Sequence, residues 1–313
     1  MSFEGLVGNE DIKNSLIKSV SNKEIVNSYM FVGQEGIGKK RFAKEFSKMI
    51  LCLEENKTSC GNCNSCIKFE SDNHPDFWLI EPDGNSIKIA QMRKMQENIY
   101  QKPIISNRKV FIIDDADKMT EEAQNSLLKT LEEPPEYVTI ILIVANENFM
   151  LNTIRSRCLK IYFKNIETSQ MVSYISRNSM FDNVDENIIG MCNGSFAKLE
   201  NIQQYLEQYV QVENVFNSIL EKKETSIIKI FKNCEIIYKS KDNIQDILEY
   251  MLVIIYNKIK KQEGPYYKYF EISKIVENTR VKLNSNSNYD MCIDEMLLRI
   301  WEEMNEKHSG NKV

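Results

Sequence analysis

A glycine-rich segment near the start of the sequence limits the possible folds more than any other feature. An apolar run, residues 30–32, leads into Gly33-Gln-Glu-Gly-Ile-Gly-Lys39, and a helix-forming stretch follows. This order has the G-x-x-x-x-G-K spacing of a phosphate-binding loop, in which backbone N–H groups turn toward an anion and the lysine reaches a β- or γ-phosphate. The segment predicts an α/β nucleotide-binding fold. The residues expected around the phosphates are Gly33, Gly36, Gly38 and Lys39.

The residue after the loop lysine departs from this pattern. A loop that hydrolyses a nucleotide carries Ser or Thr there, because the hydroxyl binds Mg²⁺. This chain has Lys40, which cannot ligate a cation. Further along, an apolar strand ends in Asp114 and Asp115, the Walker B arrangement, in which the first Asp holds Mg²⁺ through water and a second acid orients the attacking water. The predicted phosphate loop therefore keeps the residues that give it its shape, but it lacks the hydroxyl that binds Mg²⁺.

The order of apolar segments supports a sheet covered by helices. Strand-type runs alternate with helical patterns up to about Phe163, which predicts a parallel sheet with helices on both faces. The expected strands are 77–81, 110–113 and 138–144, and the expected helices are 87–100 and 120–133. Beyond Phe163 a small helical unit, punctuated by Phe181-Asp-Asn183 and Cys192-Asn-Gly-Ser195, precedes an all-helical remainder. Its expected helices are 201–222, 224–238, 242–262, 268–282 and 289–306.

Composition narrows the class of protein. A chain of 313 residues predicts about two or three domains, and a hydrophobic content of 42% is enough for real cores. The net charge of −5 argues against a surface that binds nucleic acid everywhere, but it allows a local basic patch. No apolar run approaches the ~20 residues that span a membrane, and no leader pattern follows Met1. We therefore expect a cytoplasmic protein, with no membrane partner, whose eight cysteines are thiols or metal ligands.

Four cysteines form a close group in the sequence. Cys52, Cys60, Cys63 and Cys66 have the spacing C-x7-C-x2-C-x2-C in a polar stretch that cannot bury them by itself. Four thiolates so close suit a closed, tetrahedral, structural Zn²⁺ site. An iron–sulfur cluster is the alternative, since C-x2-C-x2-C also occurs in ferredoxins. No Cys-Pro follows and the fourth cysteine lies upstream, so we favour zinc.

Two sets of basic residues are further candidates. Arg155 and Arg157 follow a sheet strand, where an arginine can reach a neighbouring subunit's γ-phosphate, although a solvated pair is the simpler interpretation. A local basic cluster around the helix 87–100 is either a solvated helix face or, as the family resemblance described below implies, a contact for the DNA backbone. This cluster contains Lys88, Arg93 and Lys94, with Lys102, Arg108 and Lys109.

Several segments together resemble the AAA+ clamp-loader subunits of bacterial DNA polymerase III. The most specific are Asn125-Ser-Leu-Leu-Lys-Thr-Leu-Glu-Glu-Pro-Pro135 and Ser156-Arg-Cys158. The others are Phe3-Glu-Gly-Leu-Val-Gly8, the glycine-rich loop, the four-cysteine insert, His74-Pro-Asp76 and Asp114-Asp-Ala-Asp-Lys-Met119. The resemblance covers residues 1 to about 200 firmly and the remainder more loosely. It implies an α/β AAA+ domain at 1–164 with a zinc insert at 52–66, a helical lid at 165–203 and a helical collar at 204–313.

Two branches of the family share this layout, the ATP-hydrolysing gamma/tau subunits and delta prime. Departures from the family pattern indicate which of them this chain resembles. Lys40 replaces the Mg²⁺-binding hydroxyl, and Asp115 stands where the hydrolysing branch carries Glu. Val144, followed by Ala145 and Asn146, falls where the sensor-1 strand usually ends in Thr or Ser, and Gly194-Ser-Phe-Ala-Lys198 shows no sensor-2 arginine. The printed sequence also has no tau-like extension after its collar. The chain resembles the delta prime branch, which implies a loader subunit without intrinsic ATPase.

The resemblance also implies partners and roles. Delta prime subunits assemble with delta and three gamma/tau subunits into a pentamer that loads the sliding clamp on primer–template DNA. By this resemblance Arg157 is an arginine finger for an adjacent gamma/tau subunit, and Arg155 stabilises the local turn. Lys39 and the glycines allow ATP or ADP to bind, but the bulk of Lys40 makes weak or absent binding the expectation.

Two alternatives remain open. One is an active gamma/tau-type ATPase that tolerates Lys40, and the other is a stand-alone zinc protein that uses the AAA+ fold as a scaffold. Steady-state ATP hydrolysis by the purified chain distinguishes the first alternative, and entry into a pentamer with gamma and delta distinguishes the second. A hydrolase based on histidine is disfavoured, because His74 lies in a family motif and His308 lies in the tail.

Overall fold

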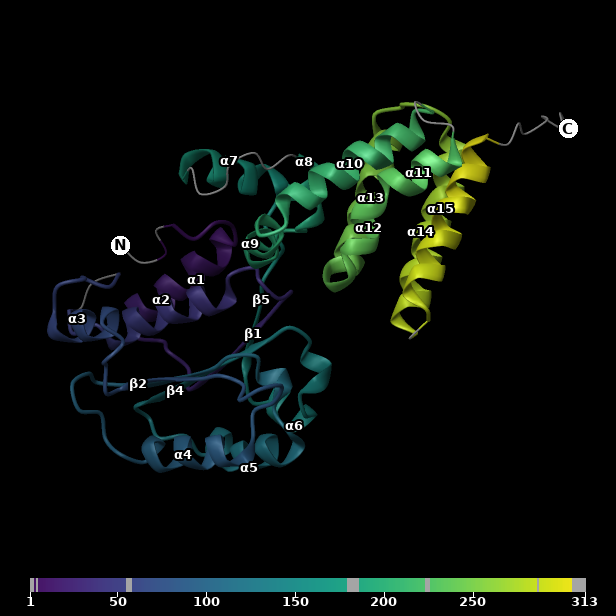
Figure 1. Ribbon diagram of the computed structural model, residues 1–313. Helices are drawn as coiled ribbons and strands as arrows, with labels where there is room; N and C mark the ends of the chain where they lie inside the picture. The colour runs from purple at the N-terminus through teal and green to yellow at the C-terminus, as the bar shows by residue number, and fades with distance from the viewer. Residues whose placement is uncertain are drawn as a thin grey trace, which may run out of the picture. The chain divides into compact units, whose positions relative to one another are not determined.

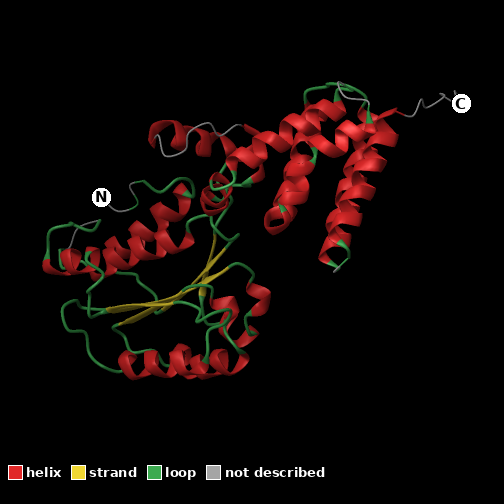
Figure 2. Cartoon of the chain, viewed as in Figure 1, coloured by secondary structure: helices red, strands yellow, loops and turns green. Residues whose placement is uncertain are grey.

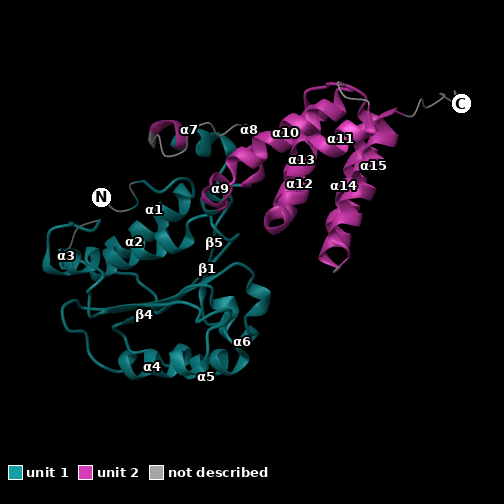
Figure 3. Ribbon diagram, viewed as in Figure 1, with its two compact units in different colours: residues 1–174, 194–197 teal, residues 175–193, 198–313 magenta. Residues whose placement is uncertain are grey.

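A computed structural model of the chain describes residues 3, 5–54, 58–178, 186–222, 226–285 and 287–305. These residues form two compact units, shown in Figure 3. Unit 1 consists of Met1–Tyr174 and Gly194–Ala197, and unit 2 of Ile175–Asn193 and Lys198–Val313. Residues Gly194–Ala197 therefore pack with the first unit although they follow part of the second in sequence. Within the described ranges, no helix is both long and apolar enough to cross a membrane.

A parallel sheet of five strands forms the centre of unit 1, in the order β2-β3-β4-β1-β5. The strands are β1 (Ser28–Val32), β2 (Phe77–Ile80), β3 (Lys109–Ile113), β4 (Val138–Val144) and β5 (Leu159–Tyr162). The three central strands, β1, β3 and β4, are buried along their whole length. This burial explains why they read as continuous apolar runs in the sequence.

Helices cover both faces of the sheet (Figures 1 and 2). On one face, Tyr29, Phe31 and Ile112 pack with apolar residues of α1 (Glu10–Ser21) and α2 (Lys39–Leu51). On the other face, the alternate strand residues pack with α4 (Ile89–Ile99) and α5 (Glu121–Glu132). Successive strand side chains point to opposite faces, so each central strand contributes to two cores. The remaining elements of this part are α3 (Asn64–Glu70), α6 (Asn152–Arg155) and the 3-10 turns η1 (Ala116–Lys118) and η2 (Glu147–Phe149).

Only helices are found in the described part of the chain after β5. They begin with α7 (Thr168–Asn178), α8 (Glu186–Met191) and α9 (Phe196–Gln203). The longer helices of unit 2 are α10 (Leu206–Leu220), α13 (Ile244–Lys260), α14 (Tyr266–Asn284) and α15 (Tyr289–Asn305), with α11 (Ile227–Asn233), α12 (Glu235–Lys239) and the turn η3 (Lys241–Asn243) between them. Their core contains fully buried aromatic residues, including Tyr209 and Tyr250 packed edge to face.

The fold class predicted from the sequence is confirmed, a phosphate-loop α/β unit followed by helices. The expected strands lie within a residue of their observed bounds, and Thr120 caps α5 as expected, its Oγ1 accepting from Ala123 N–H. The prediction missed β5 and α3 and treated α11 and α12 as one helix. The edge strand β5 escapes notice because its four residues are only half buried, so no continuous apolar run marks it. The Phe181-Asp-Asn183 boundary lies outside the described residues.

Candidate functional site

The lysine of the glycine-rich loop is bonded to the loop itself. Lys39 begins α2 and is almost fully buried. Its Nζ donates to the backbone carbonyl oxygens of Gly33, at 2.5 Å, and Gln34, at 2.7 Å. Burial lowers the pKa of the Lys39 ammonium, although the aspartates after β3 partly oppose this effect. The cation that would meet a phosphate is thus held by the loop's own carbonyl groups.

A second segment of unit 1 lies directly against the outer side of this loop. Gly36 has a φ of +79°, which favours glycine, and a Cβ at this position would lie 2.0 Å from Ser195 Oγ and 3.0 Å from Ala197 Cβ. The Asn165 side-chain amide also donates to Gln34 Oε1 at 2.8 Å. The phosphate-loop glycine at this position is therefore required by protein packing as well as by backbone conformation.

Lys40 points to the ends of the two strands next to it. Its Nζ lies 3.0 Å from Asp114 Oδ2 and also makes an ion pair with Glu81. Asp114 follows β3 and Glu81 follows β2, and these strands are parallel neighbours, so their carboxyl ends meet. Burial lowers the pKa of Lys40, but hydrogen bonds and charge from Glu81 and Asp114 outweigh it and raise the pKa overall. The ammonium therefore occupies the carboxylate site that the Walker B pattern assigns to a metal.

The other carboxylates after β3 also have partners within the chain. Asp115, in the left-handed region with a φ of 48°, pairs through Oδ2 with Lys118 Nζ at 2.7 Å. Asp117 Oδ2 accepts from the backbone N–H groups of Ala145 and Asn146, both at 3.0 Å. The Asn146 side chain, the polar substitute considered at the sensor-1 position, accepts instead from Asn148 N–H as the cap of η2. At the sensor-2 position, Lys198 pairs with Glu249 at 2.9 Å.

Arg157 lies at the opposite edge of the sheet. It stands between α6 and β5, beside residues 26–28 at the amino end of β1, and lines a cavity of about 460 Å³ with them. Its Nη1 donates to Thr153 O and its Nη2 to Glu132 Oε1, both at 2.7 Å. A five-residue strand spans ~16 Å, so Arg157 cannot reach the phosphate loop of its own chain. Arg155 makes only local contacts, with Asn152 at 3.2 Å and Glu147 at 3.4 Å.

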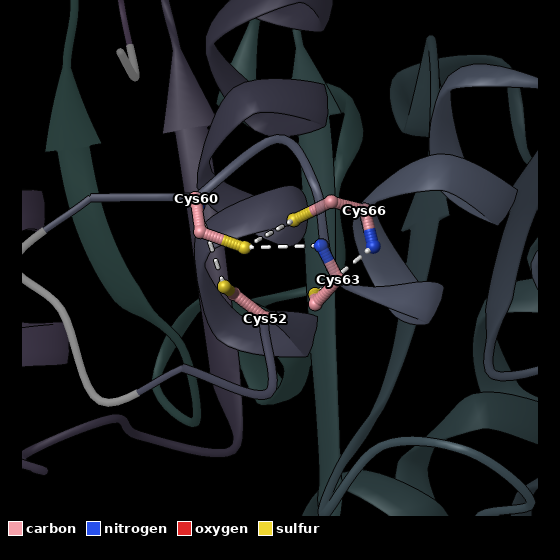
Figure 4. Close-up of side chains that lie close together, drawn as sticks. All are labelled: Cys52, Cys60, Cys63 and Cys66. Atoms are coloured by element: carbon pink, nitrogen blue, oxygen red, sulfur yellow. Dashed lines mark hydrogen bonds between the residues drawn. The ribbon is translucent and has the colours of Figure 1, made fainter.

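The four cysteines predicted as metal ligands converge (Figure 4). Their sulfur atoms all lie within 4.8 Å of one another, and Cys60 Sγ is 3.9 Å from Cys66 Sγ. A tetrahedral ion with Zn–S bonds of ~2.3 Å has sulfur–sulfur edges of about 3.8 Å, so the residues fit one ion. Hydrogen bonding from Asn62 N–H lowers the pKa of Cys60 to about 6, whereas burial raises the pKa of Cys66 to about 12. The group could hold a metal ion, and a bound cation would favour the thiolate of each cysteine.

Polar residues behind this cluster fix it to the sheet. Ser65, on α3, donates to Leu51 O at 2.6 Å and lies 2.9 Å from His74 Nε2. His74 Nδ1 accepts from Asp76 N–H at 3.0 Å. The Asp76 carboxylate in turn accepts three backbone N–H groups of residues 104–106, at 2.7–2.9 Å. His74 and Asp76 therefore form hydrogen bonds that support the four-cysteine insert.

The candidate DNA-contact residues divide into exposed and buried side chains. Lys88, Arg93 and Lys94 are exposed on and next to α4, and Lys88 lies 3.7 Å from Asp83. Lys109, which the sequence placed in the same cluster, is 2% exposed, and its Nζ donates to Asn98 O at 3.0 Å. That part of the predicted patch is wrong, because the lysine stem is buried at the start of β3 and its charge is satisfied inside.

Comparison with known proteins identifies the family. The model of the family described as DNA polymerase III, delta subunit, matches residues 8–167. The delta' subunit of DNA polymerase III from Bacillus subtilis is 30% identical over 246 residues, 78% of this chain and 74% of that protein. The chain belongs to the delta' family of DNA polymerase III subunits. This confirms the predicted resemblance to clamp-loader subunits.

Two further proteins are also similar to the chain. The tau/gamma subunit of Haemophilus influenzae is 33% identical over 185 residues, which are 58% of this chain but only 27% of that protein. The chain therefore spans about a quarter of this relative's length. A solved gamma-subunit-related protein of Thermotoga maritima has a TM-score of 0.48 at 15% identity, over 93% of this chain and 99% of that one.

The structure adds residues that the sequence analysis did not find. Glu81, Lys118 and Glu132 each neutralise a predicted site residue. The Asp115–Lys118 pair had a signal in the sequence, since residues three apart lie together in a helical turn. Glu81 and Glu132 had none, because their proximity to Lys40 and Arg157 depends on the spatial order of strands and helices.

Proposed function

We propose that this chain is a delta prime-type subunit of the bacterial DNA polymerase III clamp loader that does not hydrolyse ATP itself. It assembles with delta and gamma/tau subunits into a hetero-pentamer and supplies Arg157 in trans to the nucleotide of an adjacent subunit. It thereby helps to load the sliding clamp on primed DNA during replication.

The observation that carries this proposal is the contrast between Lys40 and Arg157. Lys40 pairs with the carboxylate that would hold Mg²⁺, and Lys39 bonds its own loop, so ATP or ADP binds weakly or not at all. Arg157 stands at the far end of the sheet, beside a cavity, with one third of its side chain exposed. An arginine in this place serves another chain's phosphate, and such fingers are worth ~10³–10⁵ in rate in well-studied NTPases.

The other candidate sites have supporting roles in this proposal. The ion held by Cys52, Cys60, Cys63 and Cys66 is a structural Zn²⁺, since four thiolates leave no open coordination position for a substrate. Lys88, Arg93 and Lys94 contact the DNA backbone through phosphates alone. We propose three domains, an AAA+ domain at residues 1–164, a lid at 165–203 and a collar at 204–313, and the collar holds the ring together.

Reconstitution with the delta and gamma/tau subunits of the same organism tests the function. Arg157→Ala should leave assembly intact, as measured by size-exclusion chromatography. The single-turnover rate of hydrolysis at the one ATP site that Arg157 completes should fall by ~10³-fold or more, and clamp loading should fall with it. Arg155→Ala is the matched control, because Arg155 makes only local contacts, and it should load clamps normally.

Three results would contradict this function. Normal loading by the Arg157→Ala complex removes the arginine-finger role. Steady-state ATP hydrolysis by the isolated chain, at the rate of the gamma/tau subunit, favours the gamma/tau-type ATPase instead. Failure to enter any complex with delta and gamma/tau leaves a stand-alone zinc protein.

A further inference from the structure

His74 is a buried histidine beside the four-cysteine insert. It is 5% exposed and lies in the segment between α3 and β2. Its Nε2 is 2.9 Å from Ser65 Oγ and 3.3 Å from Ser106 Oγ, and both serines are buried as well. A buried imidazole needs a partner for each ring nitrogen, so its surroundings determine which nitrogen carries the proton.

The hydrogen-bond partners of His74 allow only one tautomer. Its Nδ1 lies 3.0 Å from the backbone nitrogen of Asp76, whose N–H can only donate, so Nδ1 is the acceptor. Nε2 therefore carries the proton of the neutral ring and donates to the serine oxygens. The hydroxyl protons of Ser65 and Ser106 both go to Leu51 O, at 2.6 and 2.7 Å, which leaves oxygen lone pairs for His74. Every donor in this network has an acceptor only while the imidazole is neutral.

The same network joins both ends of the insert to the sheet. Leu51 ends α2 and directly precedes Cys52. Ser65 lies in α3 and directly precedes Cys66. On the other side of the ring, the backbone carbonyl of Asp76 accepts a hydrogen bond from β3 at 2.9 Å. The imidazole thus connects the sheet to the backbone beside two of the four cysteines.

We propose that His74 is a positioning residue of the four-cysteine site and makes this site sensitive to pH. The neutral imidazole holds the backbone beside Cys52 and Cys66 in the metal-binding arrangement, and a second proton, on Nδ1, releases it. Groups that orient metal ligands without touching the ion contribute ~10–100-fold to metal affinity. The effect on the metal rests on the zinc site of the proposed function, whereas the fixed tautomer and its response to pH do not.

Protonation of the ring has an identifiable cost. The imidazolium would direct Nδ1–H at the N–H of Asp76, so two donors would face each other. Burial lowers the pKa of His74, the Asp76 carboxylate opposes this effect, and the charge of Lys68 on α3 adds to it. The groups that α3 and the loop at 104–106 direct at Nε2 are neutral hydroxyls, and α2 contributes a neutral carbonyl to them. Because the pKa is lower in the folded chain than the ~6.5 of free histidine, the stabilisation is complete above pH ~6.5 and is lost as the pH falls.

Nuclear magnetic resonance of the full-length chain tests the tautomer directly. The chain has two histidines, so His308→Gln leaves the signals of His74 alone in a two-bond ¹⁵N–¹H correlation spectrum. We expect the Nε2–H tautomer at about pH 7.5 and a titration midpoint below the ~6.5 of free histidine. The Nδ1–H tautomer, or a midpoint at or above that value, overturns the proposal.

Loss of zinc tests the consequence for the cysteines. The zinc-replete chain is mixed with excess EDTA between about pH 7.5 and 5.5, and the retained zinc is followed by elemental analysis. Protonation of the cysteines speeds this loss in any variant, so His74→Gln is the matched control, because its amide donates to the serines but does not titrate. Over this range the rate for the natural chain should rise about ten-fold more than the rate for His74→Gln, the factor for one pKa unit.

His74→Asn tests the positioning role separately. Its side chain can accept from Asp76 N–H but is too short to reach the serines, so zinc should be lost ~10–100-fold faster even at about pH 7.5. Equal pH dependence in the natural chain and His74→Gln overturns the proposal, and so does a His74→Asn chain that retains zinc as the natural chain does. A natural chain without zinc contradicts the zinc site of the proposed function instead. The tautomer and the titration midpoint then decide the proposal, as they do where His74→Gln fails to fold.

Discussion

The two edges of the sheet in unit 1 carry the same kinds of charged groups, but they use them differently. At the carboxyl edge, Lys39, Lys40, Asp115 and Asp117 each have a partner within the chain, and Ser195 lies against the loop. At the amino edge, Arg157 is held by one half-exposed carboxylate and one carbonyl beside a cavity of about 460 Å³. Lys40 and Arg157 are similarly exposed, at 37% and 33% of their side chains, so the two edges differ in the partners of these cations and in the cavity beside Arg157.

Under the proposed function, this difference shows how a nucleotide-binding fold could lose its own chemistry without losing stability. Removing the Mg²⁺-binding hydroxyl alone would leave Asp114 and Glu81 as an uncompensated pair of carboxylates. Lys40 supplies the compensating charge, so the residue that would prevent metal binding under the proposed function also pairs with both strand ends. The pairing of Arg157 with Glu132 is weaker, because it lies at the surface. There Arg157 can exchange the carboxylate for water or for another anion at little cost.

The largest expected effect concerns the closed loop at the carboxyl edge. Gly36→Ala should destabilise the chain by about 2–4 kcal/mol, since a positive φ costs alanine ~1 kcal/mol and the methyl group must displace Ser195 and Ala197, an overpacking worth ~1–3 kcal/mol. Urea unfolding monitored by circular dichroism measures the change.

Gly38→Ala is the matched control for this prediction. Gly38 also has a positive φ, of +95°, but a Cβ there meets no atom within 4 Å, so only the backbone cost applies. The difference between the two variants therefore isolates the contact with Ser195. Equal destabilisation would show that the loop is open at Gly36, and the contrast between the two edges would disappear.

The sequence was sufficient for the central strands and for the convergence of the four cysteines, for different physical reasons. Strands buried on both faces must be apolar throughout, so β3 and β4 are visible as runs. The cysteines are close in sequence, and a short segment can bring them together without the rest of the fold. Local information is enough in both cases.

The partners of the charged residues could not be predicted from the sequence. Lys40 was recognised as a departure, but its pairing with Glu81 depends on β2 lying next to β3, which no local pattern encodes. Lys109 was expected at the surface because its neighbours are basic, whereas its position at the start of a fully buried strand directs its charge to Asn98 O. Strand order and packing decide both outcomes.

Removal of the proposed zinc ion should have a smaller effect that spares both edges. The cysteine cluster begins at the carboxyl end of α2, the end opposite to the phosphate loop, so losing the ion should release α3 and lower the unfolding temperature by several degrees. The natural chain should contain one zinc ion by elemental analysis, and Cys60→Ser should contain none. Cys292→Ser, at a buried position of α15 in unit 2, should keep it. A natural chain free of zinc, or one containing iron and sulfide, would contradict the structural zinc site.

The smallest expected effect is at Glu132, which under the proposed function competes with a neighbour's phosphate for the guanidinium of Arg157. Glu132→Gln removes a surface ion pair worth about 0–1 kcal/mol, so the stability of the chain should change little. In the assembled loader, the KM for ATP should fall by up to about five-fold with kcat unchanged, because the cost of breaking the Glu132–Arg157 pair disappears equally from the bound ground state and from the transition state.

Glu133→Gln, at the exposed neighbouring position, should leave KM and kcat as they are. A drop in kcat for Glu132→Gln, like that expected for Arg157→Ala, would mean that the carboxylate aims the arginine at the phosphate. The amino edge would then be as fixed as the carboxyl edge, since both would depend on a carboxylate that holds a cation in one position. An unchanged KM would show that the Glu132–Arg157 pair breaks before the phosphate binds. The approach of the neighbouring subunit, and not ATP binding, would then release Arg157.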